Sequence, residues 1–249
     1  MKVLGLDSSG LVAGVALIQD DVLIAEYTTN YKKTHSQTLL PMLDELRRMV
    51  DLDLKSIDLI AVAAGPGSFT GLRIGSATAK GLGLALDIPL AAVPTVDALA
   101  YNLYGCEQLI CPMMDARRGQ VYTGIYTFVN GEMQVIQEQC AISVEELVGR
   151  LKEECKKYGK KVVLLGDGVP VYREKVQEIL QGQCEFAPAS CNRQRAACVA
   201  VLGQSLAAAG KTVSSDDFAP EYLRMSQAER ERMEAAEAHR ELMQAGITK

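Results

Sequence analysis

The stretch that most constrains how this chain can fold is AAGPGSFTGLRIG, at positions 63–75, which holds four glycines and one proline between apolar segments. Glycine-rich loops often bind phosphate, but no Lys-Ser or Lys-Thr pair follows these glycines. Their spacing also differs from the dinucleotide-binding fingerprint, so neither type of phosphate-binding loop is indicated. The Gly-Pro-Gly run instead predicts a sharp turn from a strand into a helix, because glycine adopts backbone angles that other residues resist.

Small residues recur at every fourth position beyond this turn, at Gly71, Gly75, Ala79 and Gly83. In a helix this spacing places them along one ridge. Glycine inside a helix costs about 0.5–1 kcal/mol relative to alanine, so the ridge needs a structural reason. A smooth ridge lets another backbone approach closely. That backbone belongs either to this chain's own sheet or to a helix of another chain, and the sequence leaves both alternatives open.

The length and composition are those of a soluble globular protein with one large domain or two lobes. The 249 residues include 26 Lys and Arg against 31 Asp and Glu, so the net charge is −5. Proteins that grip nucleic acid alone usually carry a basic balance, and direct RNA binding is therefore disfavoured. The start runs directly into a strand pattern, which predicts no signal peptide, and no apolar run approaches the roughly 20 residues of a membrane span.

The seven cysteines are scattered and form no CxxC pair. An odd number of unpaired cysteines indicates reduced thiols, with neither a zinc site nor a disulfide framework. The expected location is therefore the cytoplasm, with no membrane partner.

The sequence pattern of the first half of the chain predicts strands joined by tight turns, followed by helices and further strands. Antiparallel strands are predicted at 2–7, 12–18 and 22–28, with a turn at 8–10. Helices are predicted at about 36–50, 72–86 and 96–104, and buried strands at 57–64 and 90–93. Thr95 is expected to cap the third of these helices.

The second half repeats this order. Strands are predicted at 109–115, 120–128, 133–142 and 162–168. Ser143 with Glu146 forms a capping box at the start of a helix that reaches about residue 157. Further helices are predicted at 172–180 and 193–209.

A repeated lobe with a mixed β-sheet and flanking helices is the architecture of the actin-like ATPase and sugar-kinase (ASKHA) superfamily. The expected fold is therefore α/β, with two duplicated lobes at 1–105 and 106–224 and a charged helical tail at 225–249. This inference concerns the fold alone, and function has to be argued from the sites.

Several segments resemble the TsaB family, also called YeaZ, the dimerisation subunits of the bacterial machinery that makes threonylcarbamoyladenosine in tRNA. They are LGLDSS at 4–9, THSQTLLPML at 34–43, GPGSFTGLRIG at 65–75, VPTVDALA at 93–100, DARRGQVY at 115–122 and PEYLR at 220–224. The similarity spans residues 2 to about 224. It implies an actin-like fold and a paralogue of the catalytic subunit, TsaD.

One departure from that paralogue bears on activity. TsaD-type proteins carry a His-x-x-x-His metal motif, and the i, i+4 spacing sets both imidazoles on one helical face. The matching positions here are Thr95 and Leu99, neither of which replaces an imidazole ligand. The resemblance therefore implies no metal site, no catalytic residue and no cofactor of its own. It implies a non-catalytic scaffold and activator that pairs with TsaD and with the ATPase TsaE, and contacts tRNA only through their complex.

Two turns are candidates for a vestigial nucleotide site. Asp7, Ser8 and Ser9 occupy the hairpin turn where active superfamily members hold phosphate and metal, and Asp115 and Arg117 occupy the equivalent turn of the second lobe. Arg118 follows in the same turn, and two arginines can hold phosphate or a carboxylate. Asp, Ser and Arg are also ordinary turn residues, so ATP or ADP remains an expectation for the complex only.

The partner surface is expected on the first-lobe helices at about 36–50 and 72–86. Their apolar residues cover more than one helical face, which leaves area for TsaD or, without TsaD, for a second copy of the chain. The residues expected there are Leu39, Leu40, Met42, Leu43 and Leu46, together with the ridge Gly71, Gly75, Ala79 and Gly83.

The alternative function class is an active enzyme with this fold, either a small-molecule kinase or a glycoprotease. A protease needs a nucleophile, a histidine and a carboxylate in one site. The only histidines are His35 and His239, and His35 before a helix is typical of a capping or surface residue. The first turn also lacks the glycine-threonine phosphate grip of the kinases.

Overall fold

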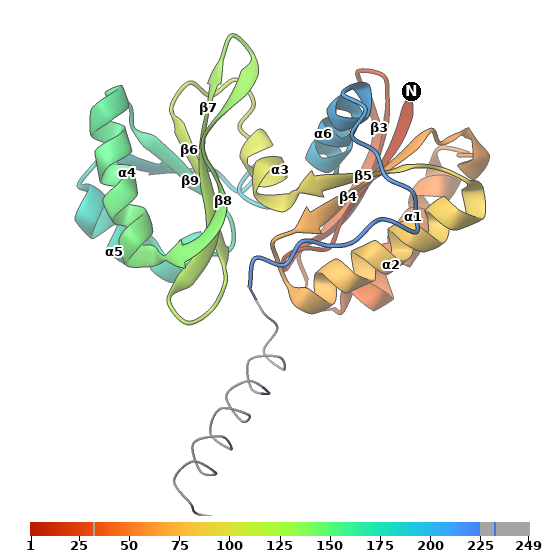
Figure 1. Ribbon diagram of the computed structural model, residues 1–249, viewed down its shortest axis with the longest axis horizontal. Coiled ribbons are helices and arrows are strands. Elements are labelled where there is room, and N and C mark those ends of the chain that lie inside the picture. Colours follow the sequence, from red (N-terminus) through yellow and green to blue (C-terminus); the bar gives the residue numbers. More distant parts are fainter. Residues whose placement is uncertain (32, 225–231, 233–249) are drawn as a thin grey trace, which may run out of the picture.

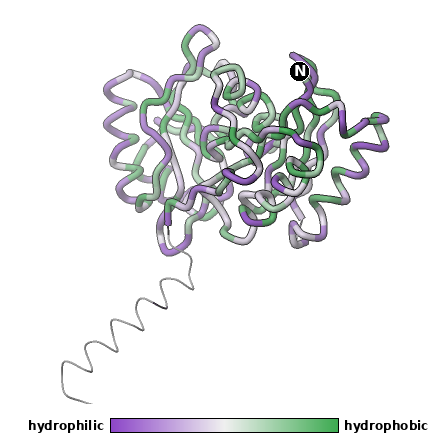
Figure 2. Tube along the Cα trace, turned by 45° about the vertical axis from the view of Figure 1, so that its right-hand side comes forward, coloured by the Kyte–Doolittle hydropathy of each residue, from purple (hydrophilic) through white to green (hydrophobic). Residues whose placement is uncertain are grey.

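The computed structural model describes residues 1–31, 33–224 and 232, and the predicted tail at 225–249 therefore lies almost wholly outside the described residues. The chain forms two lobes that lie side by side, each built on one five-stranded sheet (Figure 1). Hydrophobic residues follow the strands through the interior, and hydrophilic residues follow the outer helices and loops (Figure 2).

The first sheet has the strand order β3-β2-β1-β4-β5. Its strands are β1 (Lys2–Asp7), β2 (Ala13–Gln19), β3 (Val22–Thr29), β4 (Leu59–Gly65) and β5 (Leu90–Pro94). The first three form an antiparallel meander, whereas β4 pairs with β1 and β5 pairs with β4 in parallel. Both faces are covered, which explains why every residue of β4 is buried.

The second sheet repeats this pattern in the order β10-β9-β6-β7-β8. Its strands are β6 (Leu109–Asp115), β7 (Gln120–Val129), β8 (Glu132–Ser143), β9 (Val162–Leu165) and β10 (Cys184–Phe186). Again a meander is followed by two parallel strands. The duplicated mixed sheets confirm the actin-like ASKHA fold expected from the sequence.

Two helices cover one face of the first sheet, α1 (His35–Met49) and α2 (Phe69–Leu86). Leu39, Leu43 and Leu46 of α1 are buried in the core that they share with β1 and β2. The single turn η1 (Leu54–Ser56) leads from α1 towards β4. The opposite face is covered by α6 (Ala196–Ala208), whose Val199 and Ala200 pack on β1 and β4.

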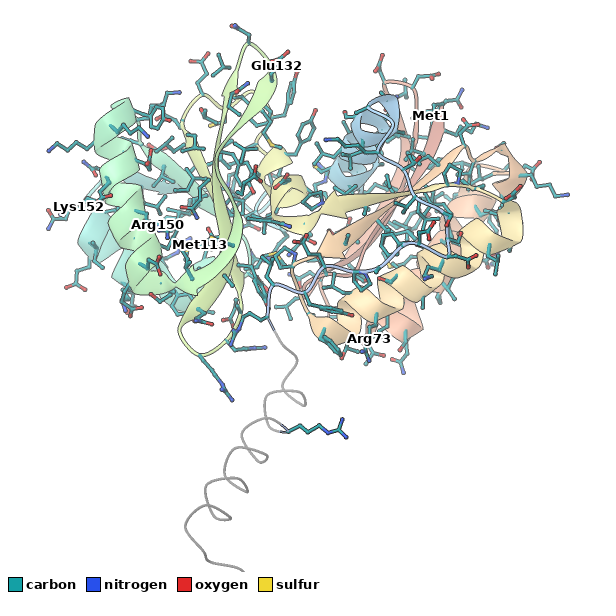
Figure 3. All side chains as sticks on the ribbon, in the orientation of Figure 1. Met1, Arg73, Met113, Glu132, Arg150 and Lys152 are labelled. Atoms are coloured by element: carbon teal, nitrogen blue, oxygen red, sulfur yellow. The ribbon has the colours of Figure 1, made fainter. Side chains whose placement is uncertain are left out.

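The second sheet is also covered on both faces. Helices α4 (Val144–Tyr158) and α5 (Val169–Leu180) pack on one face around Leu147, Leu151 and Val176. Figure 3 shows Met113 inside this lobe and Lys152 projecting from the outer side of α4. The other face packs on α3 (Thr95–Tyr101), through Val96, Leu99 and Ala100.

The lobes therefore exchange their last helices. Helix α3 ends the first half of the chain but contributes to the core of the second sheet, and α6 ends the second half but covers the first sheet. Residue 213 also returns to the first sheet, where Val213 bridges to Leu90. The expected division into lobes at 1–105 and 106–224 stays a prediction, and across it the apolar face of each sheet is buried by a helix from the other half.

Local capping signals are confirmed at one helix and corrected at another. The Ser143 hydroxyl accepts a hydrogen bond from the Glu146 amide at 3.1 Å, as the capping box predicts. Thr95 is instead the first residue of α3, after an N-cap at Pro94. Its hydroxyl accepts a hydrogen bond from the Gly65 amide at 3.1 Å, so it fastens α3 to the end of β4.

The glycine-rich turn allows backbone segments to touch. A Cβ atom on Gly67 would overlap the carbonyl oxygen of Ser9, and one on Gly71 would overlap that of Ser8. The Ser68 amide donates to the Ser9 carbonyl at 2.7 Å, which binds the hairpin turn to the start of α2. These glycines shape the turn and the entry of α2.

The ridge on α2 faces the interior of this chain. Gly71, Gly75, Ala79 and Gly83 are all buried, against the Ser8 turn, the first-lobe core and Leu90. The hypothesis that they line a partner interface is therefore wrong. A four-residue period fixes which residues share a face but not which direction the face points.

Two substitutions in α2 test this packing. Gly71→Ala should lower the free energy of unfolding by about 1–3 kcal/mol, because the new methyl group collides with backbone. Gly81→Ala, whose methyl group meets nothing within 4 Å, should raise it by about 0.5–1 kcal/mol. Urea unfolding of both variants measures the difference, and equal free energies of unfolding would contradict the close contact of Gly71 with the Ser8 backbone.

Candidate functional site

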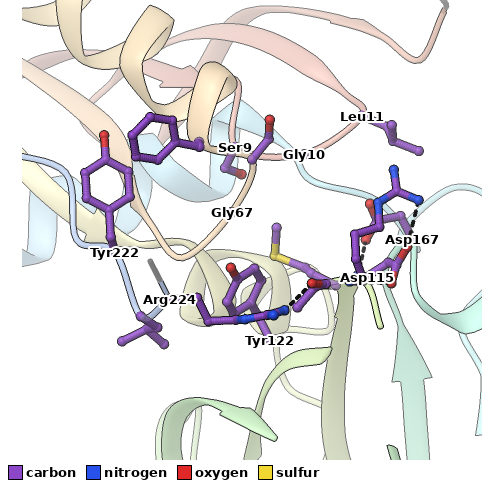
Figure 4. A pocket seen from close by; sticks show the side chains of 15 residues that line it. Ser9, Gly10, Leu11, Gly67, Asp115, Tyr122, Asp167, Tyr222 and Arg224 are labelled. Carbon is purple, nitrogen blue, oxygen red and sulfur yellow. Dashed lines mark hydrogen bonds and ion pairs between the residues drawn. The ribbon is translucent and has the colours of Figure 1, made fainter. Parts of the chain in front are cut away.

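A cavity of about 390 Å³ lies between the lobes. Three segments form its walls, as Figure 4 shows: the hairpin turn with the start of α2, the β6–β7 turn with the end of β9, and a stretch near residue 222. The lining includes charged and aromatic side chains, namely Phe69, Asp115, Arg117, Tyr122, Asp167, Tyr222 and Arg224.

Most polar groups of the hairpin turn form hydrogen bonds within the protein, although the Asp7 Oδ2 atom is buried without a partner among the described residues. The Asp7 carboxylate accepts hydrogen bonds from the Ser9 amide at 2.8 Å and the Ser9 hydroxyl at 2.6 Å. The Ser8 hydroxyl donates to the Gly71 carbonyl at 2.8 Å. All three residues are buried, and burial raises the pKa of Asp7. Of the three, only Ser9 contributes to the cavity wall.

The second-lobe turn is partly open. Asp115 accepts a hydrogen bond from the Arg117 amide at 2.9 Å, and the Arg117 guanidinium lies 3.2 Å from the same carboxylate. The Arg117 side chain is 81% exposed. Arg117, Arg118 and Gly119 all have positive φ, which makes the turn tight. The structure therefore brings Ser9, Asp115 and Arg117 to one cavity and places Asp7 and Ser8 beneath it.

The glycine turn after β9 reaches the same cavity. Asp167 accepts a hydrogen bond from the Asp115 amide at 3.1 Å, and burial raises the pKa of Asp167. Gly166 and Gly168 lie against the backbone of Met113. This turn thus holds β6 and β9 together at the cavity floor.

Sequence reasoning missed the third wall, residues 222–224. Tyr222 stacks on Phe69 with ring centroids 4.7 Å apart, and Arg73 covers the same Phe69 ring at 4.1 Å. The Arg224 guanidinium donates to the carbonyl of Ala116 in the second-lobe turn. The PEYLR segment signalled a family feature, but its place beside the cavity depends on contacts across the whole chain.

A second missed feature lies on α3, between the lobes. The Tyr126 hydroxyl of β7 donates to Asp97 at 2.7 Å. Burial, together with the negative charges of Glu138 and Glu221, raises the pKa of Asp97, although the hydrogen bond from Tyr126 opposes this shift. Burial and the neighbouring Asp97 likewise raise the pKa of Tyr126. Asp97 is therefore a half-buried carboxyl group that joins the two lobes.

The positions compared with the metal motif hold no ligands. Thr95 and Leu99 are fully buried, the first bonded to Gly65 and the second in the core shared with the second sheet. In the part of the chain that the structure describes, no three His, Cys, Asp or Glu side chains gather as a metal site. Burial raises the pKa of the Cys111 and Cys198 thiols to about 12, so both stay protonated at neutral pH.

His35 has a structural place at the first position of α1. Its Nε2 atom lies 2.8 Å from the carbonyl oxygen of Gly10, which fastens α1 to the hairpin turn. No described nucleophile or carboxylate forms a hydrogen bond with the ring. His239 lies outside the described residues.

The residues expected on the partner surface of α1 are divided by the structure. Leu39, Leu43 and Leu46 are buried, so their assignment to a partner surface is corrected, whereas Met42 is half-buried and Leu40 is exposed. The outward side of α2 carries exposed Ala77, Gly81, Leu84 and Ala85, and Met49 is exposed on α1. An exposed apolar strip thus runs along α2, two residues beyond the ridge at Ala77, Gly81 and Ala85, whereas Leu40 and Met49 lie on different sides of α1.

The duplicated mixed sheets, exchanged helices and interlobe cavity define a two-lobed protein of the actin-like class. Residues 22–232 match the family model of TsaD, tRNA N6-adenosine threonylcarbamoyltransferase. The tRNA threonylcarbamoyladenosine biosynthesis protein TsaB of Bacillus subtilis is 35% identical over 92% of this chain and 96% of its own length. The chain belongs to the TsaB family.

Other similarities agree with this assignment. TsaB of Escherichia coli is 28% identical over 90% of this chain and 95% of its own length. The solved structure of YeaZ from Pseudomonas aeruginosa superposes with a TM-score of 0.71 and 26% identity, covering 89% of this chain and 99% of that chain. None of the described helices combines the length and apolarity needed to cross a membrane.

The raised pKa of Asp97 predicts a pH dependence. Because the folded protein binds this proton more tightly than the unfolded chain does, the free energy of unfolding should fall as pH rises from the ordinary value of 3.8 through the raised pKa. Asp97→Asn keeps an oxygen that accepts the hydrogen bond from Tyr126 but cannot titrate. The free energy of unfolding of this variant should therefore fall less with rising pH than that of the native protein. Urea unfolding across pH measures this, with exposed Asp216→Asn as the control. An Asp97→Asn profile parallel to that of the native protein would refute it.

Proposed function

We propose that this protein is a non-catalytic scaffold subunit for threonylcarbamoyl transfer to tRNA, with TsaD as its catalytic partner and TsaE as the associated ATPase. The observation that carries the proposal is the state of the hairpin turn. Asp7 and Ser8 are buried and bonded internally, so the groups that would handle phosphate and metal in an active relative do not reach the cavity. Thr95 and Leu99 are likewise committed to packing.

Membership of the TsaB family supports the assignment to the threonylcarbamoyladenosine pathway, because the relatives are named tRNA threonylcarbamoyladenosine biosynthesis proteins. Proteins that bind RNA alone owe much of their affinity to contacts between basic residues and phosphate. The net charge of −5 disfavours such binding by this chain, which supports tRNA contact through the complex. A pathway built on tRNA also fits a cytoplasmic location.

The exposed strip on α2 supports the pairing surface. Leu84 in this strip is 71% exposed, and Leu40 on the neighbouring helix α1 is 54% exposed. Gly81 has open space outside it, so a partner helix can approach the α2 backbone closely. We assign the same strip to TsaD and to a second copy of this chain, and the two assemblies therefore compete.

The catalytic part of the proposal is tested by reconstitution. Purified protein incubated with threonylcarbamoyl-AMP and tRNA should give no threonylcarbamoyladenosine, and addition of TsaD with TsaE and ATP should restore the product. The modified nucleoside can be counted after digestion of the tRNA. Robust modification by this chain alone would overturn the proposal and favour an active enzyme.

The pairing surface is tested with a matched pair of helix glycines. Gly81→Leu should weaken association with TsaD by at least tenfold, because the side chain holds the helices apart. Gly149→Leu, at an equally open position on α4 of the second lobe, should leave it unchanged. Titration by calorimetry measures both affinities. A folded Gly81→Leu variant that pairs as the native protein does would place the interface elsewhere.

A further inference from the structure

The segment 213–224, here called the strap, returns from the end of α6 and lies along the first lobe. At its start, Val213 and Leu90 exchange two backbone hydrogen bonds of 2.9 Å at the edge of β5. Lys80 of α2 then donates to the carbonyls of Asp216 and Phe218 at 3.2 and 3.0 Å. Phe218 is buried in the first-lobe core. The strap is therefore firmly attached to the first lobe over this length.

Closer to the cavity, the strap lies on the glycine-rich turn. The Glu221 amide donates to the Ala64 carbonyl at 2.7 Å. A Cβ atom on Gly65 would overlap the Glu221 carbonyl, so this glycine makes room for the strap. Tyr222 adds the stack on Phe69. In Figure 4 Tyr222 lies on the first-lobe side of the cavity and Arg224 reaches towards Tyr122 on the second.

The end of the strap crosses to the second lobe. Gln139 of β8 donates to the Glu221 carboxylate at 3.1 Å. Arg224 donates to the Ala116 carbonyl in the β6–β7 turn. These two hydrogen bonds join the strap to the second lobe. On the first lobe the attachment also includes backbone hydrogen bonds and the buried Phe218 side chain.

The chain crosses between the lobes at two other places, 102–108 and 187–195, and these are bound to each other. The Asn102 side-chain amide donates to the Cys191 carbonyl at 3.1 Å and to the Arg193 carbonyl at 2.5 Å. Two crossings fastened together form one axis about which the lobes can rotate. The strap is a third crossing, at the cavity, and it opposes that rotation.

We propose that the strap is an interlobe latch, in which Arg224 and Glu221 hold the second lobe closed over the cavity. When both hydrogen bonds break, the strap stays on the first lobe and the lobes part at the β6–β7 turn. Loss of one hydrogen bond from a charged group should raise the ratio of open to closed molecules about tenfold. The latch regulates access to the cavity whether or not the chain pairs with TsaD.

A fluorescent reporter tests the latch, because the chain contains no tryptophan. Leu223→Trp places a single indole on the strap at the cavity wall. In this background Arg224→Ala should raise the rate of acrylamide quenching at least threefold and increase the radius of gyration measured by X-ray scattering. Arg118→Ala removes an exposed arginine from the same second-lobe turn and should change neither quantity.

Gln139→Ala provides a second variant that leaves the strap sequence intact. It should also raise the quenching rate and the radius of gyration, by less than Arg224→Ala does. Circular dichroism establishes that each variant is folded. Unchanged quenching in folded Arg224→Ala and Gln139→Ala would overturn the latch. So would faster quenching at a constant radius of gyration, because the strap would then move alone while the lobes stay closed.

Discussion

The contact on which the rest of the structure depends is the one between the hairpin turn and the glycine-rich turn. Here the carbonyls of Ser8 and Ser9 lie directly on Gly71 and Gly67, at a distance that no side chain would allow. This contact sets the start of α2, buries the polar groups of the hairpin and leaves Gly65 open to the strap. The hairpin turn is thus an internal joint between the first strands and the start of α2.

The second determinant is the exchange of α3 and α6 between the lobes. Each helix supplies apolar side chains to a sheet that its own half of the chain did not build. The Asp97–Tyr126 hydrogen bond and the Asn102 contacts lie along this seam. The cavity therefore lies between lobes whose cores are linked through these helices.

Much of the fold could be predicted from the sequence because its signals are local. The Ser143–Glu146 capping box and the apolar run of β4 depend on neighbouring residues alone. The direction of the α2 ridge could not be predicted, since it depends on where the Ser8 turn lies in space. The same holds for Tyr222, Asp97 and the buried state of Asp7, whose roles arise from residues far away in the chain. The three-residue strand β10 was too short to leave a pattern.

The late position of α6 has a consequence for synthesis on the ribosome. The strands of the first sheet are complete at Pro94, but the helix that covers their second face ends at Ala208. At a translation rate of about 5–20 residues per second, that apolar face waits roughly 6–23 s for its cover. The second lobe can assemble during this interval, so a nascent chain reaches its final form from the middle outwards. The exposed face of β1 and β4 is then the surface that a cellular chaperone would protect.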